Sequence, residues 1–300
     1  MANPKNGNWY GGGNDKAFPV GVGNVFHVTG IDGTGNNANT GLSEDESWLT
    51  LTYALSQCVA GNHDVIIVHD YWQPTGETWP ISVNKNNVYI VGADGAGTQL
   101  PIITPTGDTA GLSIAADRVK IAKLCINGGA SHGCIENDPG APTARWGLEI
   151  EDCWFAVLGS AQDGIKNVAA SDNVYLTVKR CRFGFAITRD GIRIEHNATR
   201  CMIGTPWGDG NIFDRVQGIG VNVVGNAADI GIYNNMFAIP ANTAGAAITL
   251  SAGTAGSLIV GNKANFGDTD MGNNPYTDGA GAGSNHWAEN YQGITLTQPA

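Results

Sequence analysis

The sequence predicts an all-β fold: a single-stranded, right-handed parallel β-helix with about 27 residues per coil and an N-terminal capping α-helix. The first reason is a short phrase, a small residue followed by a branched apolar one, that recurs between residues 111 and 250. Gly164 and Gly191 begin two copies 27 residues apart, and Gly218 begins a third copy 27 residues later. A fixed period between about 20 and 50 residues is typical of solenoids and propellers.

A second phrase follows the same interval and supplies the second reason. Cys125, Cys153 and Cys181 are successively 28 residues apart, and Asn235 follows 54 residues after Cys181. Equivalent residues of stacked coils form ladders, so we expect the three cysteines to form one inward column of small apolar side chains. The six cysteines are interpreted as free thiols, although the backbone spacing of this column would also allow a disulfide.

The third reason is the content of each period. Short alternating runs such as Val119–Ile121 and Val174–Val178 are separated by Gly, Asn and Asp, which is typical of strands and turns. Helical repeats need longer runs of 3.6-residue periodicity, and a propeller blade needs about 40 residues. A period of about 27 residues instead fits one coil of three short strands.

Composition limits the classes of partner. The 300 residues are expected to form one elongated domain, since solenoids grow by adding coils. A formal net charge of −11 argues against nucleic acid and against an anionic membrane as partners. No apolar run is long enough to span a membrane, so we expect no membrane contact.

The first 24 residues differ from the rest of the chain. Residues 1–24 are rich in Gly and Asn and contain two aromatic residues, Trp9 and Tyr10. We expect an N-terminal arm that either orders against a neighbouring subunit or stays disordered alone. Its aromatic residues are candidate contacts to a partner or a glycan.

The β-helix domain is expected at residues 25–266 and begins with a cap. Ser43 and Glu46 have the spacing of a capping box, and the apolar residues that follow lie on one helical face. These residues predict a helix at about 44–60. Such a helix would cover the open end of the first coil, whose strand edges and apolar interior would otherwise be exposed.

Residues 25–92 also carry a family resemblance. They contain Phe26-His-Val, a loop rich in Gly and Asn, the helix pattern from Trp48 to Leu55, and the strands Val65–Val68 and Val88–Val91. This order resembles the N-terminal cap and first coil of the pectate-lyase-like right-handed parallel β-helix superfamily. The resemblance implies the fold, but it selects no function, because the superfamily contains lyases, hydrolases, phage tailspikes and non-enzymatic virion proteins.

The C-terminal segment loses the repeat. Residues 267–300 are Gly- and Asn-rich at first and then contain Trp287 and an alternating pattern. We expect a C-terminal cap or assembly tail, in which Trp287 is another candidate contact to a partner or glycan.

Two aspartates are the candidates for catalysis. Asp163 and Asp190 each precede a Gly-Ile pair and are 27 residues apart, so adjacent coils would bring them to about the carboxylate separation of a retaining glycosidase. The alternative interpretation is turn chemistry, repeated because the coil repeats. Both interpretations stay open at this point. No cofactor and no metal site is expected, since no convergent ligand set is visible.

Half of the basic residues lie within 50 positions of the acidic chain. This band contains Arg180, Arg182, Arg189 and Arg193. They form either an ordinary solvated face or a docking surface for an acidic partner or a glycan.

The functional expectation combines these observations. The chain carries no recognisable motif for polysaccharide degradation and opens without an apolar secretory segment, so we expect it to be made and kept in a host cytoplasm. It most resembles a bacteriophage structural protein that lysis releases. The resemblance implies a non-enzymatic capsid decoration or spike subunit of the virion, a homotrimer that contacts capsid or tail proteins.

Two other functions stay open. One is a glycan-binding module, in which Trp146, Trp154 and Trp207 would stack on a host surface glycan. The other is a polysaccharide lyase or glycosidase, such as a tailspike, that uses Asp163 and Asp190.

Overall fold

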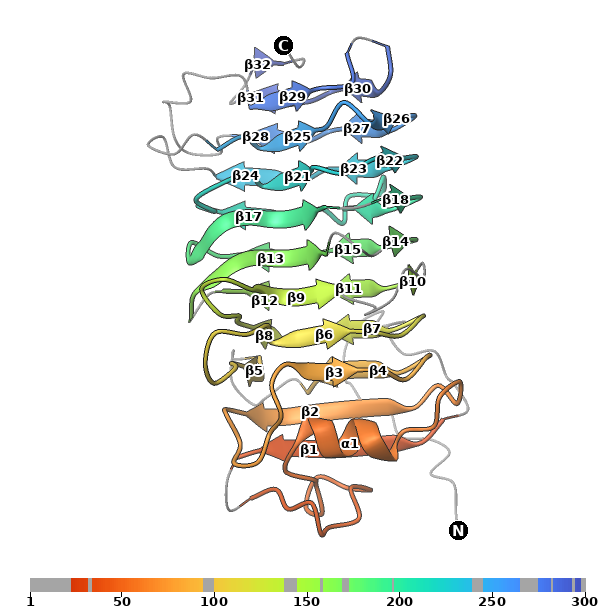
Figure 1. The fold of residues 1–300 in the computed structure, drawn as a ribbon, viewed down its shortest axis with the longest axis vertical. Helices are drawn as coiled ribbons and strands as arrows, with labels where there is room; N and C mark the ends of the chain where they lie inside the picture. Colours follow the sequence, from red (N-terminus) through yellow and green to blue (C-terminus); the bar gives the residue numbers. More distant parts are fainter. Residues whose placement is uncertain are drawn as a thin grey trace.

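The computed structural model describes residues 23–31, 34–93, 100–137, 145–156, 159–168, 173–195, 197–238, 245–264, 275–281, 283–292 and 295–297. The chain winds into a right-handed parallel β-helix whose coils stack along one long axis (Figure 1). The predicted fold class is confirmed. Trp9 and Tyr10 lie outside the described residues.

Four sheets, here called I to IV, run along the axis, and in the middle coils the chain passes in turn through sheets III, II, IV and I. Sheet I contains β1 (Val25–Gly30), β2 (Val65–Tyr71), β4 (Tyr89–Gly92), β7 (Lys120–Ala122), β11 (Glu149–Glu151), β15 (Thr177–Lys179), β19 (Met202–Ile203), β23 (Gly231–Tyr233), β27 (Leu258–Val260) and β30 (His286–Ala288). Sheet II contains β3 (Ile81–Val83), β6 (Leu112–Ile114), β9 (Gly133–Asn137), β13 (Ala161–Asn167), β17 (Ile187–Ile194), β21 (Val221–Val223), β25 (Ile248–Leu250) and β29 (Tyr276–Asp278).

The other two sheets are narrower. Sheet III contains β5 (Ile102–Ile103), β8 (Cys125–Ile126), β12 (Trp154–Phe155), β16 (Arg182–Phe183), β20 (Ile212–Asp214), β24 (Met236–Ala238), β28 (Lys263–Ala264), β31 (Tyr291–Gln292) and β32 (Thr295–Leu296). Sheet IV contains β10 (Arg145–Trp146), β14 (Asn173–Val174), β18 (Ala198–Thr199), β22 (Ala227–Ala228) and β26 (Thr254–Ala255).

Strand pairing fixes the repeat. Ile150 of β11 pairs with Ile121 below and Val178 above, so equivalent residues lie about 28 positions apart. These inward residues are buried and belong to one continuous apolar core. Among the described strands, pairing is parallel except between β31 and β32 at the C-terminal end.

A stack of aromatic rings explains the recurring glycine. Phe155, Phe183, Phe213 and Phe237 follow one another in sheet III, with ring centroids 4.8, 4.5 and 4.6 Å apart. A Cβ on Gly191 would lie 2.5 Å from Cδ1 of Phe213. Each Gly-Ile phrase therefore makes room for the phenylalanine of the next coil, and the two repeated phrases form one packing unit.

The predicted repeat is displaced at one coil. Ile192 pairs with Val221, so Gly191 lies beside Gly220 and not beside Gly218. The coil between these glycines is two residues longer than the preceding one. Sequence spacing alone favoured Gly218, because Gly218 and Gly220 both precede a branched residue.

One buried column changes from cysteine to asparagine along the axis. Trp154 pairs with Cys125 and with Arg182, so the residues preceding them, Leu124, Cys153 and Cys181, share the column. The expectation that Cys125 belongs to it is wrong by one residue. All six cysteines are buried, and none of them is in a disulfide.

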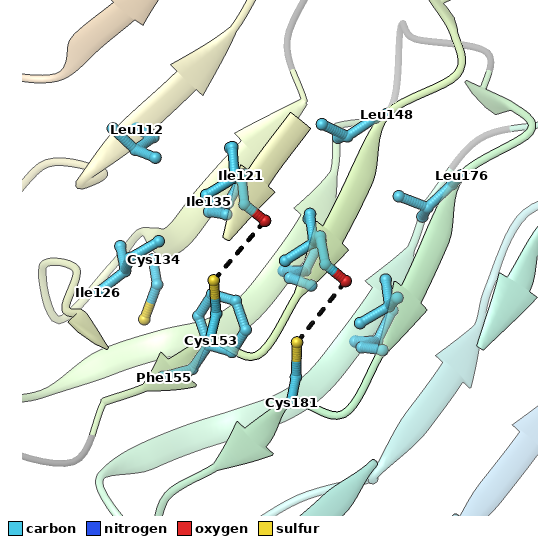
Figure 2. Packing of buried hydrophobic residues seen from close by; sticks show 14 of the residues in the cluster. Leu112, Ile121, Ile126, Cys134, Ile135, Leu148, Cys153, Phe155, Leu176 and Cys181 are labelled. Carbon is cyan, nitrogen blue, oxygen red and sulfur yellow. Dashed lines mark hydrogen bonds between the residues drawn. The ribbon is translucent and has the colours of Figure 1, made fainter. Parts of the chain in front are cut away.

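The thiols in this column act as weak donors. Cys153 Sγ lies 3.8 Å from the carbonyl oxygen of Ile121, and Cys181 Sγ lies 3.7 Å from that of Ile150 (Figure 2). Further along the axis, asparagines take the column: Asn211, Asn235, Asn262 and Asn290. Each of the first three donates its side-chain amide to the Oδ1 of the next, at 2.9, 3.0 and 2.9 Å.

The capping helix is shorter than predicted and starts later. Helix α1 spans Leu51–Gln57 and lies against β1 at the N-terminal end (Figure 1). Its N-cap is Thr50, whose side chain accepts from the backbone N–H of Tyr53. The predicted capping box fails because Glu46 instead accepts a hydrogen bond from Thr40 at 2.6 Å.

The C-terminal segment continues the solenoid beyond residue 266. Strands β29, β30 and β31 pair in parallel with the preceding coil. Trp287 pairs with Ile259, and its indole N–H donates to Asp278 Oδ2 at 2.9 Å. Trp287 also packs against Tyr276, with ring centroids 5.8 Å apart. This tryptophan therefore helps to close the last coil.

Candidate functional site

Asp163 and Asp190 occupy neighbouring coils, as the repeat predicts. They pair across β13 and β17. Both lie within strands of sheet II, next to the glycines that the phenylalanine stack requires. The side chain of Asp163 has no exposed surface and that of Asp190 is 3% exposed.

Both oxygens of each carboxylate accept hydrogen bonds. Asp163 Oδ1 accepts from Arg189 Nε at 2.9 Å and from the backbone N–H of Asp190 at 3.2 Å. Its other oxygen pairs with Arg189 Nη2. Asp190 Oδ1 accepts from the backbone N–H of Ile219 at 3.0 Å.

The second oxygen of Asp190 joins a wider network. It accepts from Arg193 Nη1 at 2.7 Å and from Asn222 Nδ2 at 2.9 Å. Glu195 Oε1 in turn accepts from Arg193 Nε at 2.7 Å and lies 3.7 Å from Arg189 Nη2. Two arginines and three carboxylates therefore form one cross-coil cluster.

The electrostatics of the cluster follow from burial. Burial raises the pKa of Asp163 above its ordinary value, although the Arg189 guanidinium opposes this shift. Burial also disfavours the charged form of Arg193, but hydrogen bonds to Glu195 and Asp190 outweigh burial and raise its pKa. A general acid or nucleophile must reach the substrate. The hydrogen bonds and burial of both aspartates favour a structural role over catalysis.

A second ionic cluster lies on the outer face of sheet I. Glu151 pairs with Lys120 at 2.5 Å and with Lys179 at 3.0 Å. Arg180 binds Asp152 through Nε at 2.8 Å and also pairs with Glu151 at 3.1 Å. These contacts join successive coils.

The predicted basic band is thus largely neutralised by nearby carboxylates. Arg182 pairs with Asp214 at 2.5 Å, and Arg215 approaches the same carboxylate at 3.3 Å. The Arg182 guanidinium also lies 5.9 Å from the ring centre of Trp154. The structure places the candidate contacts Arg180, Arg182 and Arg189 in ion pairs that link coils, and it places Arg193 in ion pairs within its own coil.

Exposed aromatic side chains also lie away from these ion pairs. Trp146 and Tyr175 lie at the corner between sheets IV and I, with ring centroids 5.9 Å apart. Trp207 is 85% exposed in the turn before β20. The sequence pattern indicated both tryptophans but not Tyr175. The 28-residue interval between Gly147 and Tyr175 is the signal that places this tyrosine one coil above Trp146.

Within the described part of the chain, no group of three or more His, Cys, Asp or Glu side chains is arranged to hold a metal ion. In the same residues, no helix has the length and apolar character needed to cross a membrane.

Comparison with known proteins gives distant structural likenesses only. No family model and no curated protein matches the chain. A GH136 lacto-N-biosidase from Eubacterium ramulus is 14% identical, with a TM-score of 0.49 over 90% of this chain. The chain spans 60% of the length of that enzyme. A doubly substituted pectate lyase from Xanthomonas campestris is 15% identical, with a TM-score of 0.41 over 94% of this chain and 86% of its own. The β-helix assignment rests on the strand pairing described above.

Proposed function

We propose that the chain is a non-enzymatic structural protein, a rigid β-helical subunit of a larger assembly. The observation that carries the proposal is the state of Asp163 and Asp190. Both are buried, and their oxygens accept hydrogen bonds from Arg189, Arg193 and backbone amides. The Asp163–Arg189 pair joins one coil to the next.

The setting we propose is a bacteriophage particle, in which the subunit is a homotrimeric capsid decoration or spike protein. This setting extends the sequence resemblance stated above. A column of stacked coils with a capped N-terminal end suits such a role, since each coil is supported by its two neighbours.

The experiment is the solution mass of the full chain by light scattering, followed by the same measurement after deletion of residues 1–20. A stable trimer that dissociates on deletion, together with binding to capsids of a candidate phage, supports the proposal. A monomer that deletion leaves unchanged contradicts it.

Cleavage of a polysaccharide is tested on the same preparation. Release of reducing ends or unsaturated products from a polysaccharide panel, abolished in Asp163→Asn, would make the protein an enzyme and overturn the proposal. Asp209→Asn is the matched control, because Asp209 is a partly exposed carboxylate that pairs with Arg180 away from the Asp163 cluster.

A further inference from the structure

One corner of the coil, between sheets IV and I, is built from residues in left-handed backbone conformation. Arg118, Gly147, Tyr175, Arg200 and Asp229 occupy this corner in successive coils, with φ between 53° and 73°. The backbone N–H of each donates to a carbonyl oxygen of the next coil, for example Tyr175 to Thr199 at 3.1 Å. The side chains at this corner therefore project from a fixed ladder.

Gly147 contributes no side chain to that row. Its neighbours show that the backbone here accepts larger residues, because Arg118 and Tyr175 adopt the same conformation. A Cβ on Gly147 would meet only Arg118, at 3.6 Å or more, which is ordinary contact. Packing does not demand glycine at this position. The row therefore has no side chain for one coil between Arg118 and Tyr175, and we call this interruption the notch.

Aromatic rings line the notch. Trp146 precedes Gly147, is 48% exposed and lies 5.9 Å from the ring of Tyr175 at an angle of 44°. Arg200 lies over the Tyr175 ring, 5.7 Å from the ring centre, and Nη1 of Arg200 donates to the Tyr175 hydroxyl at 2.9 Å. Exposed rings held in place by neighbouring contacts offer flat apolar faces next to polar groups.

The two arginines of this corner differ from the others. The remaining arginines with described side chains each pair with a carboxylate: Arg180, Arg182, Arg189, Arg193 and Arg215. Within the described residues, neither Arg118 nor Arg200 forms an ion pair. In a chain of net charge −11, this corner offers two guanidinium groups beside two exposed rings.

We propose that this notch binds a sugar ring that carries an anionic group, within a surface glycan. The apolar face of the ring would stack on Trp146 and Tyr175, and the carboxylate or phosphate would bind Arg118 or Arg200 by charge-assisted hydrogen bonds. Single-stranded nucleic acid shares the aromatic and anionic chemistry, but the acidic chain as a whole disfavours it. This site is independent of the assembly role and of the Asp163 cluster.

The test is calorimetric titration of the full chain at low salt with three probes. They are a glucuronate-containing tetrasaccharide, the same tetrasaccharide with its carboxyl groups reduced to alcohols, and a phosphorylated mannose tetrasaccharide. Binding of at least one anionic probe, weakened about tenfold or more in Trp146→Ala, is the expected result. The stronger of the two anionic probes identifies the group that the arginines recognise.

Further variants separate the two contributions. Arg118→Gln with Arg200→Gln is expected to remove the preference for the anionic over the reduced tetrasaccharide while the melting temperature stays unchanged. Trp207→Ala, a change at a more exposed tryptophan outside the notch, is expected to leave binding intact. Absence of binding to every probe, equal loss in Trp207→Ala and Trp146→Ala, or tighter binding of a single-stranded oligonucleotide would each overturn the proposal.

Discussion

Gly191 occupies a position where no side chain fits. An added Cβ would lie 2.5 Å from Phe213 and 2.6 Å from the carbonyl oxygen of Gly220. Gly191→Ala is therefore expected to lower the free energy of unfolding by about 1–3 kcal/mol, measured by urea unfolding. Gly133→Ala is the control, because its added Cβ would come no closer than 3.1 Å to any neighbour. Equal losses in the two variants would contradict the packing argument.

The ionisation of Glu151 is expected to make the free energy of unfolding change with pH in the acid range. Burial disfavours its charged form, but the ion pairs with Lys120 and Lys179 outweigh burial and lower its pKa below the ordinary 4.5. A lowered pKa in the folded state stabilises the fold above the unfolded-state pKa, and this contribution disappears as pH falls through the folded-state value. Glu151→Gln is therefore expected to flatten the loss of stability between about pH 5 and about pH 3.

The measurement for Glu151 is chemical unfolding of both chains across that pH range. Asp45→Asn serves as control, since Asp45 is an exposed acid on a turn at the N-terminal end. A pH profile that Glu151→Gln leaves as steep as that of the unchanged chain would show that these ion pairs are not the source.

At the scale of elements, the asparagine column supports the turns between sheets I and III. Asn235 donates to the carbonyl oxygen of Ile203 at 3.0 Å and accepts from both nitrogens of Asn211 at 2.9 Å. Asn235→Ala would leave these buried groups unpaired. We expect a loss of at least about 2 kcal/mol in the free energy of unfolding.

The same column offers a contrasting variant. Cys181 already donates its backbone N–H to Asn211 Oδ1 at 2.9 Å, so an asparagine at this position would extend the ladder by one coil. Cys181→Asn is expected to retain the stability of the unchanged chain. A loss as large as that of Asn235→Ala would show that the column does not act as a continuous ladder.

Elements were predictable where the sequence repeats and unpredictable where contacts come from outside the repeat. The Gly-Ile phrase and the phenylalanine phrase predicted the coil. They recur in the sequence because the same packing of a phenylalanine against a glycine recurs from coil to coil. The start of α1 was missed because its first backbone N–H groups bind Glu77, 26 residues after Leu51. The pairing of Asp163 with Asp190 was predictable from spacing, but their hydrogen bonds with Arg189 and Arg193 depend on side-chain directions in sheet II.

At the scale of the whole molecule, ion pairs and apolar packing both connect coils that are stacked along the long axis. Several arginines of the middle coils bind carboxylates of neighbouring coils, for example Arg182 with Asp214. Exposed pairs of this kind contribute little individually. The continuous apolar core is therefore the main source of cohesion between coils.

Each coil contacts only its neighbours. A defect in a middle coil is therefore expected to remove a packing surface from the coils on both sides of it. Ile192 is fully buried and pairs with Ile165 below and Val221 above. Ile192→Asp would place an unpaired charge in this core, at several kcal/mol against a total stability of about 5–15 kcal/mol. We expect no folded protein, measured by soluble yield and circular dichroism. Thr249→Asp, an outward change in β25 whose neighbour Ile248 is buried, should fold normally. Normal melting of Ile192→Asp would show that the apolar core does not hold the coils together.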